Sequence, residues 1–206
     1  MLPVRSLACY VLLLSFTASH AQQMRLNPPQ FALMINQAVL DELKLTKDQQ
    51  EGVDSLLAEF TQEVDGQKRL VIRGGADLDT LEQDIVKLLN PKQTKRLREA
   101  WLQINGPLSI TDDKLAKELG LSADQNKKAA DAVTDMNAAM REAFQEAQGD
   151  QQKMTSEVKR LRQETRITLE KLLTAEQRDK LTKLQGEKIA NLLPSETKEA
   201  KKGEKK

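Results

Sequence analysis

Along most of this chain, apolar residues recur three and four positions apart, the spacing at which one face of an α-helix repeats. Short polar stretches containing glycine, proline or a small hydroxyl residue separate these runs. The pattern predicts helices at residues 30–43, 47–73, 78–89, 91–104, 111–120, 123–148, 150–173 and 175–192. No stretch alternates apolar and polar residues as a half-buried strand would. The sequence therefore predicts an all-α fold.

One short motif stands before four of the predicted helices. Its copies read "LKLTKDQQEGV" from Leu43, "LLNPKQTKRL" from Leu88, "LGLSADQNKKA" from Leu119 and "LLTAEQRDKL" from Leu172. In each copy a leucine precedes a small polar residue, and a glutamine follows that residue at the third position. A small polar residue at the N-cap accepts a hydrogen bond from the backbone, and glutamine three residues later bonds back to the N-cap N–H. The motif thus predicts four capping boxes, formed by Thr46 with Gln49, Asn90 with Gln93, Ser122 with Gln125 and Thr174 with Gln177. Thr111 is the expected cap of the shorter helix that ends at Gly120.

The four copies are of two kinds in alternating order. The first and third share L-x-L-[ST]-x-D-Q, with their caps at Thr46 and Ser122. The second and fourth share L-L-x-x-x-Q-x-x-x-L, with their caps at Asn90 and Thr174. Self-similarity at a similar interval is typical of a duplicated unit. The sequence therefore predicts two tandem helical units of long antiparallel helices in a thin open bundle, at 22–106 and 107–193, with "NGPLS" at 105–109 as the linker.

Residues 1–21 have the layout of a secretory signal peptide. A short start with one positive charge precedes an apolar run within 6–16, and "TASHA" supplies small residues before a cut after Ala21. This run is too short to span a membrane, so the sequence predicts no stable membrane insertion. The expected location is the periplasm, or secretion from the cell. The tail at 194–206, which is rich in lysine, lacks an apolar face and is expected to be disordered.

Removal of the signal peptide leaves little catalytic chemistry. The only Cys, His and Tyr are Cys9, His20 and Tyr10, and all three leave with it. No Gly-rich phosphate loop or nucleophile motif is present in the sequence, and the many carboxylates alternate with Lys and Arg as on solvated helix faces. The acidic cluster between Asp77 and Asp84 lacks the glycine and ligand spacing of a calcium loop. We therefore expect no enzyme activity, no cofactor and no metal site.

Two surfaces are candidates for binding another protein. A stripe on the predicted helix at 123–148 contains methionines and a phenylalanine, which adapt to irregular partners. Its alternative role, which the spacing favours, is a core seam against Met154, Val158, Leu161 and Leu172 of the next helix. Six residues are candidate contacts for such a partner: Met136, Met140, Phe144, Arg160, Arg162 and Arg166.

Charge is unevenly distributed although the chain from Gln22 onward has no net charge. Residues 41–65 are mainly acidic, whereas 87–98 and 153–171 are mainly basic. Either these segments pair within the fold, or a basic inner face attracts acidic partners. Nucleic acid is not an expected partner for an exported, neutral chain with few aromatic residues.

The motif copies "LKLTKDQQ" and "LLTAEQRDKL" resemble the LTXXQ family of exported bacterial proteins, the Spy/CpxP-like periplasmic chaperones and envelope-stress regulators. The resemblance covers nearly the whole chain after Ala21. It implies long antiparallel helices, often assembled as a cradle-shaped dimer that holds unfolded client proteins without ATP. Family members typically carry one motif pair, whereas this chain carries two, and the basic cradle of the family contrasts with its zero net charge.

The resemblance leads to two functional hypotheses. The first is an ATP-independent chaperone-like protein that binds unfolded clients through apolar and basic helix faces. The alternative is a regulator that binds one envelope signalling protein, and a purely scaffolding role is a third reading. Because two motif pairs are present, the expected assembly is either a pseudo-dimer within one chain or a homodimer.

Overall fold

The computed structural model describes residues 29–64, 67–71 and 77–192. The predicted signal peptide at 1–21 and the predicted disordered tail at 194–206 lie outside these residues. Helices dominate the described part, and its two strands form one short hairpin, so the all-α prediction is confirmed. Within these residues, no helix is both long and apolar enough to cross a membrane.

The first half of the chain combines α-helices with a hairpin. The 3-10 helix η1 (Gln30–Ile35) leads to α1 (Gln37–Leu43) and α2 (Lys47–Leu57), and the short η2 (Ala58–Phe60) follows. The strands β1 (Thr61–Val64) and β2 (Gln67–Leu70) then pair antiparallel, with Thr61 opposite Leu70. Helices α3 (Leu78–Leu88) and α4 (Pro91–Asn105) complete this half.

The second half repeats the order without a hairpin. The 3-10 helix η3 (Gly106–Thr111) leads to α5 (Asp113–Leu119) and to the long helices α6 (Ala123–Ala147) and α7 (Gln151–Leu172), after which α8 (Ala175–Leu184) ends the helical part.

The packing of the two halves is equivalent. In the first half α2 packs on α3, α1 packs on α4, and η1 contacts both α1 and α3. In the second half α6 packs on α7, α5 packs on α8, and η3 contacts both α5 and α7. Even a local backbone feature recurs, because Lys44 and Gly120 end α1 and α5 in the left-handed conformation. These correspondences are what a duplicated unit predicts.

The helix predicted at 47–73 is wrong for the described residues after Leu57, and positions 72–73 lie outside the described residues. The chain there turns into η2 and the β1–β2 hairpin, and the N–H of Val71 donates to the carbonyl of Phe60 at 2.7 Å. The sequence contains the reason, because Asp-Gly at 65–66 is a strong signal for a two-residue hairpin connection.

Three other boundaries differ from the predictions. The helix predicted at 30–43 is divided at Asn36, whose side chain accepts a hydrogen bond from the N–H of Val39 and starts a new helix. Asp112, not Thr111, caps α5. Helix α8 stops at Leu184 instead of 192, because Gly186 takes a positive φ of 63° and turns the chain away.

The segment predicted as a linker is part of the core. Gly106, Leu108, Ser109 and Ile110 of η3 are all buried. One continuous hydrophobic cluster joins Phe31 and Val39 of the first half to Leu115 and Leu169 of the second. The two halves therefore share a core through η3 and α4.

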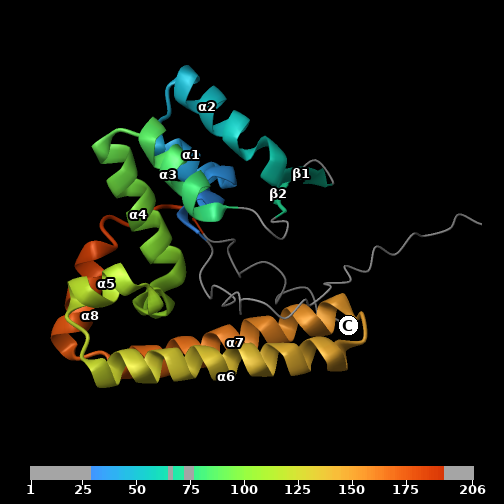
Figure 1. Ribbon diagram of the computed structural model, residues 1–206, viewed down its shortest axis with the longest axis vertical. Coiled ribbons are helices and arrows are strands. Elements are labelled where there is room, and N and C mark those ends of the chain that lie inside the picture. Colours follow the sequence, from blue (N-terminus) through green and yellow to red (C-terminus); the bar gives the residue numbers. More distant parts are fainter. Residues whose placement is uncertain (1–28, 65–66, 72–76, 193–206) are drawn as a thin grey trace, which may run out of the picture.

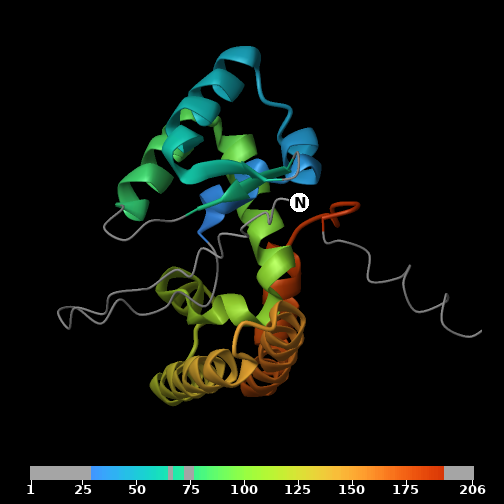
Figure 2. The same ribbon diagram turned by 90° about the vertical axis from the view of Figure 1, so that its right-hand side faces the viewer.

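The shared core leaves two hairpins projecting from the same side of the molecule (Figure 1). One consists of α6 and α7, and we call it the arm. The other projection is formed by α2 and α3, which pack on each other, and by the β1–β2 hairpin that follows α2. Seen after a quarter turn, the arm lies beneath the first half and points toward the viewer (Figure 2).

Candidate functional site

All four capping boxes are present. Thr46, Asn90, Ser122 and Thr174 each accept a hydrogen bond from the backbone N–H of the glutamine three residues later, and that glutamine accepts one from the N-cap N–H. Each box therefore satisfies two backbone donors that a helix start otherwise leaves unpaired. The polar residues of the motif thus have a structural role.

The glutamines of the second half also bind each other. Nε2 of Gln125 lies 2.7 Å from Oε1 of Gln177, and Nε2 of Gln177 lies 3.2 Å from Oε1 of Gln125. Each amide also donates to the end of the helix that precedes its partner: Gln125 to the carbonyl of Leu172, at 2.7 Å, and Gln177 to that of Gly120, at 3.2 Å. The pair therefore ties two helix starts to two helix ends.

The first half contains the same arrangement. Gln49 and Gln93 exchange hydrogen bonds of 2.9 Å in both directions. Gln49 donates to the carbonyl of Leu88, and Gln93 donates to the carbonyl of Leu43. Each unit is thus closed by one glutamine pair at the base of its helical hairpin.

Glutamine is the side chain that this geometry requires. An amide offers two N–H donors and two acceptor lone pairs. In each pair both donors are used, on the partner amide and on a carbonyl, and both lone pairs are used, on the N-cap N–H and on the partner amide. Glutamate serves equally well in an isolated capping box but has no donor when ionised. The signal in the sequence for such pairs is the presence of glutamine, and never glutamate, at all four motif positions.

The three candidate apolar contacts all lie on α6 of the arm, and they differ in how far each side chain is exposed to solvent. Met136 is buried in the core cluster, Met140 is half-buried, and Phe144 is 68% exposed. Opposite them on α7, Leu161 is buried, while Met154 and Val158 are half-buried. The favoured role as a core seam thus describes Met136 and also Ala147 near the tip of the arm, whereas Phe144 reaches the surface.

The three candidate arginines lie in different surroundings. Arg160 is bound on its own helix by Glu157 and Glu164, and hydrogen bonds with these carboxylates hold the pKa of Arg160 above its ordinary value. Arg162 is half-buried, and burial lowers the pKa of its guanidinium. Arg166 lies over Gly106 of η3, where an added Cβ would stand 3.5 Å from Nη2 of the arginine.

The acidic and basic segments meet at one arginine of the first half. Arg96, within the basic stretch at 87–98, forms an ion pair of 2.8 Å with Glu42 of the acidic stretch and one of 2.9 Å with Glu99 of its own helix. Arg98 pairs with Glu118 of α5. These contacts support pairing of opposite charges within the fold at this place.

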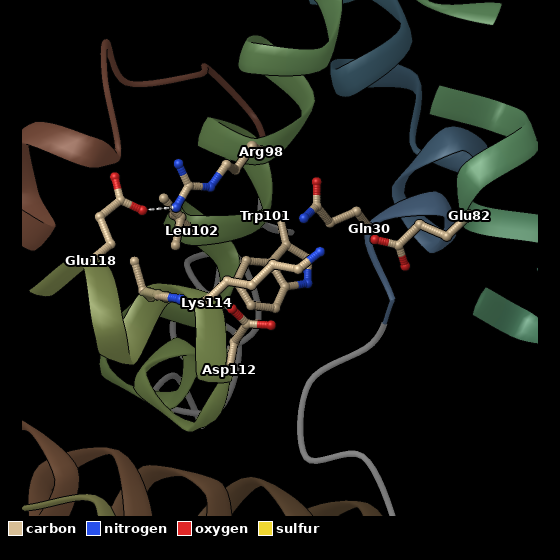
Figure 3. Close-up of a pocket in the computed structure, with 9 residues that line it drawn as sticks. Gln30, Glu82, Arg98, Trp101, Leu102, Asp112, Lys114 and Glu118 are labelled. Atoms are coloured by element: carbon tan, nitrogen blue, oxygen red, sulfur yellow. Dashed lines mark hydrogen bonds and ion pairs between the residues drawn. The ribbon is translucent and has the colours of Figure 1, made fainter. Parts of the chain in front are cut away.

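A pocket of about 320 Å³ lies where the two halves meet. Figure 3 shows the indole of Trp101 at its centre, with Gln30 and Glu82 on one side and Arg98 and Glu118 on the other. Trp101 is only 7% exposed, and Arg98 is paired with Glu118. The pocket is therefore lined by side chains that join α4 to α5, which indicates a structural junction.

Among the described residues, no group of His, Cys, Asp or Glu is arranged to hold a metal ion. Comparison of the chain with protein-family models, with curated proteins and with solved structures yields no match in any of the three.

Proposed function

We propose that this chain is an exported, ATP-independent protein of the LTXXQ type that binds unfolded client polypeptides in the periplasm. The observation that carries the proposal is the exposure of Phe144 on the distal part of the arm. A phenylalanine 68% exposed on a long helix is a large apolar group offered to solvent. Four copies of the family motif, on a helical chain that begins with the layout of a signal peptide, support the same proposal.

The geometry of the arm explains why it exposes apolar surface. Helix α6 has 25 residues, which corresponds to a length of about 37 Å at 1.5 Å per residue. Two antiparallel helices bury only the stripe that each turns toward the other. Met140, Ala143 and Val158 therefore stay half-buried beside the exposed Phe144. Methionine is unbranched and polarizable, so such a surface adapts to clients of differing shape.

The test is suppression of aggregation by the purified mature chain without ATP. Several unrelated unfolded proteins are diluted from denaturant, and light scattering is followed against the concentration of the chain. The proposal expects suppression for most of them. Replacing Met140 with Gln and Phe144 with Ser should raise the required concentration several-fold, whereas Gln145→Ser on the same helix, at an exposed position, should not.

The outcomes also separate this proposal from the regulatory alternative. A chain that suppresses no aggregation, but binds a single envelope signalling protein with high affinity, would be a regulator. In that case the proposed client-binding function is wrong, whatever the contribution of Phe144 to the second interaction.

A further inference from the structure

The residues after α8 run back across the molecule. Residues 185–192, which we call the strap, leave α8, cross α4 and reach the start of α1 in the first half (Figures 1 and 2). At its far end, the carbonyl of Leu192 accepts a hydrogen bond from Nδ2 of Asn36 at 3.4 Å. The strap thus lies on a surface formed mainly by α4, which we call the strap site.

The strap site recognises the backbone of the strap. Nε2 of Gln103 donates to the carbonyls of Gln185 and Glu187, at 2.7 and 2.8 Å, and Oε1 of Gln103 accepts from the N–H of Ile189 at 3.0 Å. Arg96 adds a hydrogen bond of 2.7 Å to the carbonyl of Glu187. These four bonds involve no side chain of the strap, so they are available to any polypeptide of the same conformation.

Two strap side chains supply the apolar contacts. Ile189 is 2% exposed and Leu192 is 5% exposed, and both belong to the hydrophobic core cluster. The residues between and before them, 187, 188, 190 and 191, are exposed. Most strap side chains therefore face solvent, except the two aliphatic residues Ile189 and Leu192, which are three positions from each other.

A glycine is also required in the strap. Gly186 takes φ of 63°, and a Cβ added there would stand 2.4 Å from Cδ of Glu99. Glu99 is itself held by Arg96 at 2.9 Å and by Lys95 at 3.7 Å. The strap site therefore fits a segment with glycine, then an aliphatic residue three positions later, then a second aliphatic residue after three more.

We propose that the strap site is a binding site for segments of other polypeptide chains with this glycine and aliphatic spacing, and that residues 185–192 occupy it in cis. The inference rests on the proposed function for the identity of these chains, which are unfolded clients. Apart from the glycine and one hydrogen bond from the side chain of Gln185 to the carbonyl of Leu102, the contacts are to backbone and to two aliphatic side chains, so the site suits clients that differ at the remaining positions. Folded proteins seldom expose such segments.

Covalent attachment gives the strap an advantage over any external segment. A short tether holds a bound segment at an effective concentration on the order of millimolar. A client segment at micromolar concentration therefore displaces a small fraction of straps unless the strap is weakened. Loss of the two aliphatic anchors should free the site and strengthen external binding.

The experiment uses the full chain and a fluorescent peptide with the sequence of residues 185–193, "QGEKIANLL". Fluorescence anisotropy should give a dissociation constant at least tenfold lower for the double variant Ile189→Ser/Leu192→Ser than for the unchanged chain. The matched control is Lys188→Ser/Ala190→Ser, at exposed strap positions, which should bind like the unchanged chain. Adding Gln103→Leu to the anchor variant should abolish binding, and a peptide with serine at both anchor positions should not bind.

A measurement on the unchanged chain covers the case in which the anchor variant unfolds. Millimolar peptide should speed hydrogen exchange at the N–H of Ile189, since that N–H loses Gln103 when the strap leaves. A peptide with serine at both anchors should leave the exchange rate unchanged. Equal exchange with both peptides would overturn the proposal.

Two further outcomes are decisive. If the unchanged chain forms dimers by exchange of straps and the anchor variant binds no peptide, the site serves a second copy, and the proposal is wrong. If it binds the peptide but suppresses no aggregation, the site stands as a polypeptide-binding site while the proposed function fails.

Discussion

The side-chain amides of Gln125 and Gln177 hydrogen-bond to each other in both directions, although 52 residues separate them in the sequence. Gln49 and Gln93 do the same across 44 residues. Each glutamine therefore caps its own helix and also joins that helix to the other helix of the same unit that begins with the motif. The motif repeats because each unit needs two such residues, one at each helix start.

Replacing Gln177 with Glu should destabilise the fold by about 1–3 kcal/mol, because the carbonyl of Gly120 and the amide oxygen of Gln125 lose the donor that Gln177 supplies. Gln177 is 9% exposed, so water replaces these bonds poorly. Urea unfolding measures the change, with Gln145→Glu on an exposed position of α6 as the control. Below about pH 4 the difference should shrink, because the protonated carboxyl regains a donor. Equal stability of the two variants would contradict the role of the pair.

Thr174→Ala should lower the free energy of unfolding by about 0.5–2 kcal/mol, the usual cost of losing an N-cap. The hydroxyl of Thr174 accepts from the N–H of Gln177 at 3.2 Å, at the start of α8 and at the opposite end of the arm from its tip (Figure 1). Client binding per folded molecule should therefore be unchanged. A loss of binding at an unchanged unfolding midpoint would make Thr174 a contact residue.

Lys44→Gly should stabilise the chain by about 0.5–1 kcal/mol. Lys44 ends α1 with φ of 48°, a conformation that costs a residue with a Cβ but not glycine, and part of this gain is offset by greater freedom of the unfolded chain. Gly120 occupies the equivalent position of the second half, so Gly120→Lys should destabilise. The midpoints of urea unfolding at constant slope measure both changes. The prediction fails if Lys44→Gly lowers the midpoint.

Acidification should weaken the start of α3 through Asp77. Hydrogen bonds from the Thr80 side chain and backbone hold the pKa of Asp77 below its ordinary value of 3.8. A carboxyl with a lowered folded pKa contributes stability above its unfolded pKa, and this is lost as pH falls through the folded value. NMR titration should follow the carboxyl of Asp77, and Thr80→Val should raise its pKa. An unchanged pKa in that variant would contradict the role of the hydroxyl.

Cutting the chain between Asn105 and Gly106 should leave two poorly folded fragments that regain helicity when mixed. Leu108 and Ile110 of the fragment that begins at Gly106 are buried in a cluster that includes the first half. Circular dichroism of the separate and mixed fragments measures this coupling. Two halves that unfold cooperatively alone and ignore each other in the mixture would show independent domains.

Local patterns in the sequence predicted much of the helical architecture. N-caps, proline at the first helical position and periodic apolar residues act within a few residues of the chain. The starts of α2, α4, α6 and α8 could therefore be placed, and so could the turn at Gly149 between α6 and α7. The hairpin at 61–70 was also readable, from Asp-Gly at 65–66, but the helical periodicity before it was extended too far.

The partners of these residues were decided by tertiary structure. Three features depend on which helices pack together: the hydrogen bond from Gln93 to the carbonyl of Leu43, the binding of the strap backbone by Gln103, and the burial of η3. The apolar stripe of the arm is a further example. The spacing of its residues predicted an apolar face on one helix, but the exposure of each residue depends on whether a neighbouring element covers it. Met136 is 4% exposed and belongs to the core cluster, whereas Phe144, on the same helix, is 68% exposed. By itself, the sequence determined where helices begin and which faces are apolar, because caps and periodicity are local, whereas contacts between residues far apart along the chain are set by packing.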